Sequence, residues 1–199
     1  MGNRPAFTHL MWGRSPVSLS QAQGIALSQS KSLRQYRMAA DTSPDGASCY
    51  SITPRLARNE KLSDAQEKMV KLLDCYLRQT IPITDELIVY RGCSANELAE
   101  LPGNAYPSFL SASTKIDEAF KFMRGCLVRI ICPVGTKMLQ VSPVQTECAS
   151  LEHDEILLPR NIRLRKEKWN LVLTDTQLVL LQAKQINQFE TWTLTNNRR

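Results

Sequence analysis

A change in the hydrophobic pattern near residue 86 limits the possible folds of this chain more than any other feature. Before it, residues 19–40 are rich in Gln, Ala, Ser and Leu, and Ser63 opens a segment in which Met69, Leu73 and Tyr76 recur at helical spacing. Residues 41–48 between these segments have the composition of a loop. After it, short β-type runs dominate. Helices followed by strands, without regular alternation, predict an α+β fold in which an N-terminal helical lobe packs on a mostly antiparallel strand core.

The strand pattern continues almost to the C-terminus. One helix, Lys115–Arg124, is expected within it. The strands are expected at Leu87–Arg91, Ser108–Ser111, Leu127–Cys132, Met138–Val141, Glu155–Leu158, Leu171–Thr174, Leu178–Gln182 and Phe189–Leu194. The 199 residues contain no repeat and no obvious linker. We therefore expect a single domain, with residues 1–85 as the helical lobe and residues 86–199 as the strand-rich core.

The basic charge of the chain raises the question of a nucleic-acid partner. The formal net charge is +6, with a pI near 9.1. Lys and Arg are nevertheless spread along the chain and cluster only at residues 163–168 and 198–199. A nucleic-acid-binding protein is therefore the less favoured alternative, and it predicts salt-sensitive binding to DNA or RNA.

The chain shows no sign of a membrane span or a metal site. No apolar run approaches the roughly 18 residues of a membrane-spanning helix, and the N-terminus lacks the layout of a signal peptide. We expect a soluble protein that is intracellular where it acts. The six cysteines are never closer than six positions apart, which excludes CxxC pairs and predicts reduced thiols.

Three short stretches together indicate the function. They are Leu87–Gly92 (LIVYRG), Ser108–Thr114 (SFLSAST) and Ser150–Pro159 (SLEHDEILLP). Each alone has an ordinary structural explanation, such as a solvated strand end or a turn. Their order and spacing together resemble the Arg-Ser-Glu class of mono-ADP-ribosyltransferases, which includes actin-modifying clostridial toxins, vertebrate ecto-enzymes and many bacterial effectors.

Other segments extend this resemblance from about residue 32 to residue 175. Ser32–Tyr36 resembles the first-helix signature of the class. Residues 50–58 resemble its Tyr-x-x-Ile-Asn-x-x-Leu-Arg segment, with Thr53 where Asn is usual. The class also has an Ala-Phe pair, which Ala119-Phe120 resembles. Residues 127–136 resemble its Leu-Arg-Ile strand and the Pro-x-Gly-Thr turn that follows it.

The resemblance implies an ADP-ribosyltransferase fold, NAD as co-substrate and no metal. Cleavage of the bond between nicotinamide and ribose leaves positive charge on the ribose, as in glycosidases. Glu155 would accept a hydrogen bond from a ribose hydroxyl and stabilise that charge. Arg91 would bind the NAD phosphates with paired donors, assisted by Arg129. Ser111 would orient Glu155 and the ribose.

The remaining expected NAD contacts are supporting ones. Ser113 would support the turn after Ser111, and Gly92 and Tyr36 would contact the cofactor. Behind Glu155, the aliphatic residues 156–158 would anchor the carboxylate on a rigid strand.

One departure from the family pattern concerns the acceptor. His153 stands two residues before the expected catalytic Glu, where arginine-modifying members carry a second Glu and other members carry Gln. Glu152 would point to the opposite face of a strand, unless the segment bulges. We therefore expect a Thr or Ser acceptor rather than Arg, with His153 as the catalytic base, or Glu147 or Glu152 in its place. His153 as a surface histidine without a catalytic duty is the alternative.

The resemblance also implies what kind of partner the protein acts on and which alternative functions are open. It implies a secreted bacterial effector that acts on a protein in the host cytoplasm. One small group of such effectors modifies ubiquitin on threonine and also departs from the arginine-type signature. The alternative functions are an NAD glycohydrolase and an inactive binding module of the same fold. The diphtheria-type branch would require His where Arg91 stands.

Overall fold

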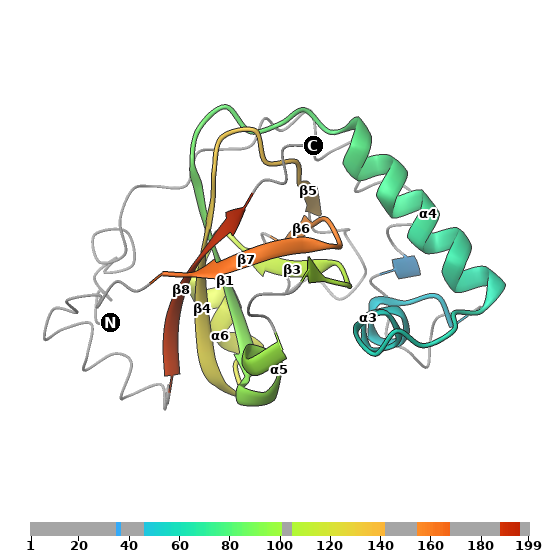
Figure 1. The fold of residues 1–199 in the computed structure, drawn as a ribbon, viewed down its shortest axis with the longest axis horizontal. Helices are drawn as coiled ribbons and strands as arrows, with labels where there is room; N and C mark the ends of the chain where they lie inside the picture. The colour runs from blue at the N-terminus through green and yellow to red at the C-terminus, as the bar shows by residue number, and fades with distance from the viewer. Residues whose placement is uncertain (1–34, 37–45, 101–104, 142–154, 168–187, 196–199) are drawn as a thin grey trace, which may run out of the picture.

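The computed structural model describes residues 35–36, 46–100, 105–141, 155–167 and 188–195 (Figure 1). Gln35 and Tyr36 are helical. The four numbered helices are α3 (Cys49–Ala57), α4 (Asp64–Gln79), α5 (Ala95–Glu100) and α6 (Ile116–Lys121). The strands are β1 (Leu87–Ser94), β2 (Ala105–Tyr106), β3 (Leu110–Ser113), β4 (Gly125–Cys132), β5 (Leu139–Val141), β6 (Glu155–Leu158), β7 (Ile162–Lys166) and β8 (Gln188–Thr195).

Helix α4 begins where the sequence predicts it. Ser63 Oγ accepts a hydrogen bond from Gln66 N at 3.3 Å, and Ser63 N donates to Gln66 Oε1 at 3.0 Å. This reciprocal pair satisfies two backbone donors at the start of the helix. The buried side chains of α4 include Met69 and Leu73, which confirms the apolar face expected from the helical spacing.

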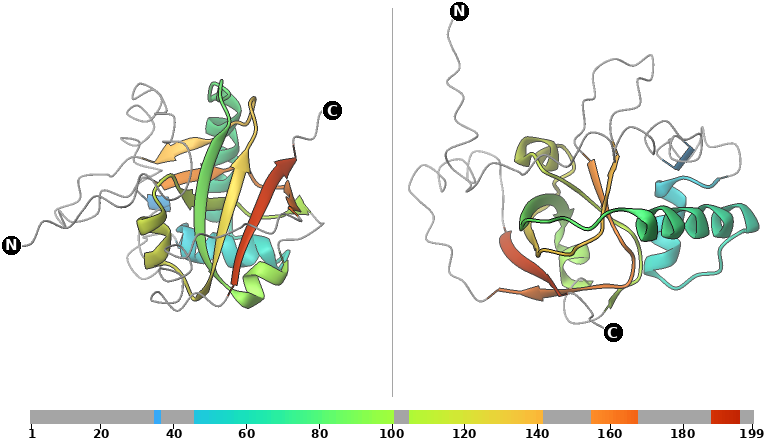
Figure 2. Two further views of the ribbon diagram at one scale, coloured as in Figure 1. Left: turned by 90° about the vertical axis from the view of Figure 1, so that its left-hand side faces the viewer. Right: turned by 90° about the horizontal axis from the view of Figure 1, so that it is seen from above.

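The eight strands form one mixed, curled sheet in the order β2-β7-β8-β4-β1-β3-β6-β5. All neighbouring pairs are antiparallel except β4 and β8. Strands β1 and β4 pair over eight positions, whereas β1 and β3 share one pair, Tyr90 and Ser113. The direction of the strands changes at this junction, so β3 and β6 run across β1, β4 and β8 (Figures 1 and 2). The predicted α+β fold with a mostly antiparallel core is confirmed.

Two main hydrophobic clusters lie on opposite sides of β3 and β6. Inside the curled sheet, Leu110 and Ile156 pack with buried side chains from β1, β4 and β8, including Trp192. On the other side, Phe109 and Leu157 pack against α3 and α4. Alternation along each strand produces this division, since successive side chains point to opposite faces. The β3–β6 face that carries Ser111, Ser113 and Glu155 is therefore the one next to the helical lobe.

An ion pair also joins the helical lobe to the sheet. Arg160, in the turn between β6 and β7, contacts Asp74 of α4 through Nε and Nη2, with Nη2 to Oδ2 at 2.7 Å. The paired geometry of a guanidinium and a carboxylate fixes direction as well as distance. It holds α4 against the end of β6, the strand that Glu155 begins.

Most of the predicted strands are present, with shifted ends. Glu155–Leu158 matches β6, and the other described predictions match β1, β3, β4, β5 and β8 to within three residues at either end. Strand β7 was not predicted, and residues 163–168 were described only as a basic cluster. Its buried Ile162 and Leu164 alternate with exposed Arg163 and Arg165, so the charges conceal a strand pattern. The expected strands Leu171–Thr174 and Leu178–Gln182 lie outside the described residues, as does nearly all of the helix expected at residues 19–40.

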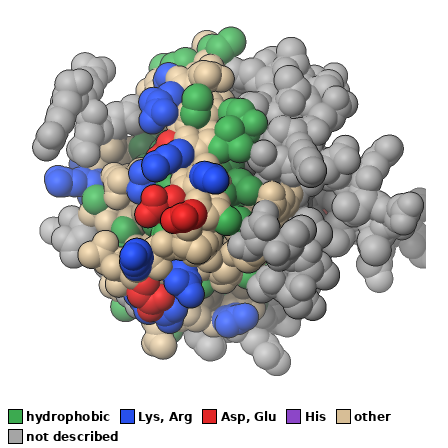
Figure 3. All heavy atoms as spheres, turned by 90° about the vertical axis from the view of Figure 1, so that its right-hand side faces the viewer, with side chains coloured by type: hydrophobic (Ala, Val, Ile, Leu, Met, Phe, Trp, Pro, Cys, Tyr) green, Lys and Arg blue, Asp and Glu red, His purple; other side chains and the backbone are tan. Residues whose placement is uncertain are grey.

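The described part of the surface is mixed in charge. On the face of the helical lobe, Lys and Arg side chains lie between Asp and Glu side chains (Figure 3). No helix within the described ranges is long and apolar enough to cross a membrane. The five cysteines of the described residues form no disulfide with one another, and no group of three His, Cys, Asp or Glu among these residues is placed to hold a metal ion.

Candidate active site

Arg91 connects three elements of the candidate site. Its side chain is 17% exposed. Nε donates to Glu97 Oε1 of α5 at 2.8 Å, and Nη2 donates to the same oxygen. Nη1 donates to the backbone carbonyl of Ser111 in β3. Arg91 therefore links β1 to the helix that follows it and to the strand that carries both candidate serines.

The electrostatic environment keeps Arg91 charged. Burial alone would lower the pKa of Arg91, because it disfavours the charged form. The carboxylate of Glu97 opposes burial and leaves the pKa of Arg91 raised. The guanidinium is therefore a permanent cation at this position.

Register places Glu155 beside the Ser motif. Ser113 lies directly opposite Glu155, and Ser111 lies opposite Leu157 on the same face. Neighbouring strands are about 4.8 Å apart, so the backbones of Ser113 and Glu155 are adjacent. Ser113 Oγ accepts a hydrogen bond from Lys115 N at 3.0 Å, which supports the turn into α6.

One row of polar positions crosses five neighbouring strands. From β8 to β6 it consists of Thr191, Arg129, Tyr90, Ser113 and Glu155, each directly opposite the next. Direct partners share a face of the sheet. The candidate carboxylate and Arg129 therefore lie on one face, separated along the row by about 14 Å at ordinary strand spacing.

Arg91 and Arg129 lie on opposite faces of the β1–β4 pair. Arg129 is opposite Tyr90, the neighbour of Arg91, and successive residues of a strand alternate between faces. The structure thus brings Arg91 to Ser111 by a hydrogen bond, while Arg129 joins Glu155 only through the row.

Two atoms in the row are buried without a hydrogen-bond partner among the described residues. They are Nε of Arg129 and Oγ1 of Thr191, a residue only 8% exposed. A buried polar group without a partner costs about 1–3 kcal/mol. An oxygen acceptor near Arg129 Nε, from water or a ligand, would relieve part of this cost.

Tyr36 lies between the helical lobe and the candidate residues. It is 2% exposed, packs edge-on against Phe109 with ring centroids 6.3 Å apart, and is hydrogen-bonded to the side chain of Thr53. Burial raises the pKa of Tyr36, and both Glu155 and Arg91 are near enough to influence it. Tyr36 is therefore close to both ends of the Arg-Ser-Glu pattern.

Gly92 permits close packing of α6 on β1. A Cβ atom at this position would lie 2.1 Å from the carbonyl oxygen of Ala119 and 2.6 Å from Met123 N. Such distances are far below van der Waals contact. Any larger residue at position 92 would push α6 away from the strand that carries Arg91.

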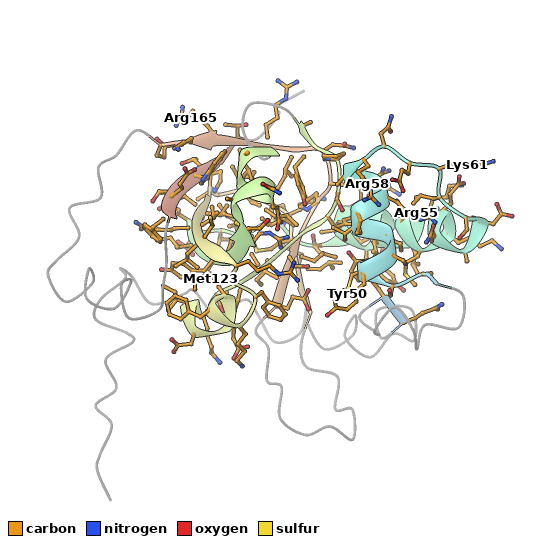
Figure 4. All side chains as sticks on the ribbon, turned by 90° about the horizontal axis from the view of Figure 1, so that it is seen from below. Tyr50, Arg55, Arg58, Lys61, Met123 and Arg165 are labelled. Carbon is orange, nitrogen blue, oxygen red and sulfur yellow. The ribbon has the colours of Figure 1, made fainter. Side chains whose placement is uncertain are left out.

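The segment at residues 50–58 contributes to both the core and the surface. Ile52 of α3 is fully buried, whereas Tyr50 is 61% exposed. Tyr50, Arg55 and Arg58 lie on the helical lobe, far from Arg165 on β7 (Figure 4). Thr53 stands where the similar family segment has Asn, and its side chain is hydrogen-bonded to Tyr36.

Glu97 and Thr191 are polar residues near the candidate site that the sequence patterns did not suggest. For Glu97 a signal is present, since Ser94-Ala-Asn-Glu97 has the spacing of a helix-capping motif directly after β1. Ser94 Oγ does accept a hydrogen bond from Glu97 N at 3.3 Å, but the Glu97 carboxylate turns to Arg91. His153, Glu147 and Glu152 lie outside the described residues.

The fold is that of the ADP-ribosyltransferase toxins. Plx2a, an ADP-ribosyltransferase toxin from Paenibacillus larvae, is similar with a TM-score of 0.60 at 16% identity, over 88% of this chain and 90% of that one. An ADP-ribosyltransferase from Clostridium botulinum gives 0.57 at 14% identity, over 92% and 98%. A structure from S. aureus, solved with NAD, gives 0.56 at 15% identity, over 88% and 94%. The sequence matches no protein-family model and no curated protein.

Proposed function

We propose that this protein is an NAD-dependent mono-ADP-ribosyltransferase, a glycosyltransferase that moves ADP-ribose from NAD to a side chain of another protein. One observation carries the proposal. Strand β3 brings the three parts of the Arg-Ser-Glu pattern together, because Ser111 accepts a hydrogen bond from Arg91 and Ser113 lies opposite Glu155. The match of the fold to toxins of this activity supports it.

Glu155 supplies the charge that the reaction requires. The bond between the ribose carbon and the nicotinamide nitrogen breaks, nicotinamide leaves as a neutral molecule, and positive charge develops on the ribose. A carboxylate fixed next to the sugar stabilises that charge. Ile156, Leu157 and Leu158 are fully buried and anchor Glu155 to the sheet.

Arg91 and Arg129 are the two cations of the proposed NAD site. The contacts of Arg91 with other described residues use three of its five N–H groups, and the two others can donate to a phosphate. Arg129, whose Nε has no hydrogen-bond partner among the described residues, is the second cation. Gly92, Ser111, Ser113 and Tyr36 are the remaining proposed contacts, and the proposal requires no metal ion.

Replacing Arg91 by Lys is expected to weaken NAD binding by about 1–3 kcal/mol. One ammonium cannot contact Glu97, Ser111 and a phosphate with the geometry of the guanidinium plane. Arg129→Lys should weaken binding less. Calorimetric titration with NAD measures both effects, and unchanged affinity in both variants would remove the two arginines from the NAD site.

The proposed acceptor is a hydroxyl group of Thr or Ser. A guanidinium is protonated at accessible pH, so an arginine acceptor calls for a nearby anion such as the second Glu of arginine-modifying members. A hydroxyl needs a base for its proton, and His153 is the proposed base. We extend the proposal to a secreted bacterial effector acting in the host cytoplasm, with ubiquitin as one acceptor to test.

The acceptor prediction is tested by treating the modified target with neutral hydroxylamine and mapping the site by mass spectrometry. A stable adduct on Thr or Ser is expected. A hydroxylamine-labile adduct on arginine would contradict the assignment.

Nicotinamide release with and without a cell lysate tests the proposed activity. A transferase releases nicotinamide faster when an acceptor protein is present. Equal release in both conditions would instead identify an NAD glycohydrolase, and NAD binding without release would identify an inactive binding module.

A further inference from the structure

Glu97 makes contacts that an ordinary helix-capping residue does not make. In a Ser-x-x-Glu capping motif the Glu side chain usually returns to the backbone at the start of its own helix. Here Oε1 of Glu97 accepts hydrogen bonds from both Nε and Nη2 of Arg91 instead. The Glu97 side chain is 27% exposed and that of Arg91 is 17% exposed, so water screens this pair only in part.

The position of Glu97 is itself fixed from two sides. Its backbone N–H donates to Ser94 Oγ, the residue that ends β1, and α5 starts directly after that strand. The carboxylate therefore sits at a set distance from the strand that carries Arg91. An arginine side chain has several rotatable bonds, and a partner on one side of the guanidinium removes most of that freedom.

The orientation set by Glu97 decides where the other N–H groups of Arg91 point. With Nε and Nη2 directed to Glu97, Nη1 reaches the carbonyl of Ser111. Two N–H groups are not used by these contacts and keep a fixed direction. Preorganised donors bind an anion more tightly than mobile ones, because less conformational entropy is lost on binding.

We propose that Glu97 is a positioning residue of the NAD site, which orients the Arg91 guanidinium toward the dinucleotide diphosphate and toward Ser111. The proposal rests on the proposed NAD-dependent function and adds to it a residue outside the Arg-Ser-Glu pattern. Glu97 touches neither NAD nor the acceptor and acts through Arg91.

The experiment compares Glu97→Ala and Glu97→Gln with the wild-type protein in NAD titrations, in nicotinamide-release kinetics and in thermal unfolding. Glu97→Ala should raise Kd and KM for NAD about tenfold, the scale of a lost charge-assisted hydrogen bond, and change kcat less than about threefold. Glu97→Gln keeps an oxygen that can accept both hydrogen bonds, so it should recover Kd and KM to within about threefold of the wild-type values.

Glu167→Ala is the matched control. Glu167 pairs with Arg165 at 3.0 Å at the end of β7, a strand that carries no proposed NAD contact. It should leave Kd, KM and kcat unchanged.

Three outcomes overturn the proposal. A lower Kd in Glu97→Ala would show that Glu97 competes with the diphosphate for Arg91. A lower melting temperature with unchanged Kd and KM would show a purely structural role. Failure of the wild-type protein to bind NAD would overturn the proposed function and this proposal with it. This outcome is distinguished from the other two because it is seen in the wild-type protein, before any change at residue 97.

Discussion

Replacing Glu155 by Gln is expected to lower the rate of nicotinamide release by about 10²–10³-fold, the usual effect of removing one preorganised electrostatic group. The amide has nearly the shape of the carboxylate and keeps the pairing of β6 with β3, in which Glu155 lies opposite Ser113. Only the negative charge near the developing ribose cation is lost. The melting temperature should therefore stay close to that of the wild-type protein.

Steady-state assays of nicotinamide release check this prediction, with Glu86→Gln as the control. Glu86 directly precedes β1, as Glu155 begins β6, but it is exposed and belongs to no part of the candidate site. Glu86→Gln should keep full activity. If Glu155→Gln retained more than about a tenth of the wild-type rate, the carboxylate would not be the group that stabilises the cation.

Gly92→Ala should destabilise the protein by about 3 kcal/mol or more, at or above the upper end of the usual cost of overpacking. The added Cβ would meet backbone atoms, the carbonyl oxygen of Ala119 and the nitrogen of Met123, rather than flexible side chains. Relief requires that α6 move off β1. The same movement would disturb Tyr90 and Leu127, which pack with α6, and would lower activity by displacing the neighbouring Arg91.

Urea unfolding of Gly92→Ala and Gly46→Ala separates this effect from the general cost of losing a glycine. Gly46 has φ +60° and no atom within 4 Å of its added Cβ, so Gly46→Ala carries only the left-handed backbone penalty of about 1–2 kcal/mol. Equal losses of stability in the two variants would contradict the close packing of α6 at Gly92.

Elements that depend on contacts between residues close in sequence were predicted from the sequence. Ser63 and Gln66 start α4 through contacts three residues apart, and Glu155–Leu158 is a strand because its aliphatic run is buried. Strand β7 was missed because its two buried positions lie among four basic or acidic ones in residues 162–167. Strand β2, with two residues, is too short to show any period.

Long-range pairing could not be predicted from the chain alone. The row from Thr191 to Glu155 depends on which strands are neighbours, and β8 lies beside β4 in parallel although about 60 residues separate them. The partner of Arg91 was hidden for another reason. The spacing of Ser94 and Glu97 predicts a capped helix, and only the three-dimensional arrangement turns the Glu97 carboxylate toward Arg91.

The transfer of ADP-ribose is tested most directly with NAD labelled separately in its adenine and nicotinamide parts, incubated with the protein and a cell lysate. The proposed function predicts that the adenine label becomes attached to an acceptor protein while the nicotinamide label appears as free nicotinamide, and that Glu155→Gln prevents both. Two results would contradict the proposed transferase. In one, nicotinamide is released but the adenine label stays in small molecules. In the other, neither nicotinamide release nor labelling of protein exceeds the level seen with Glu155→Gln.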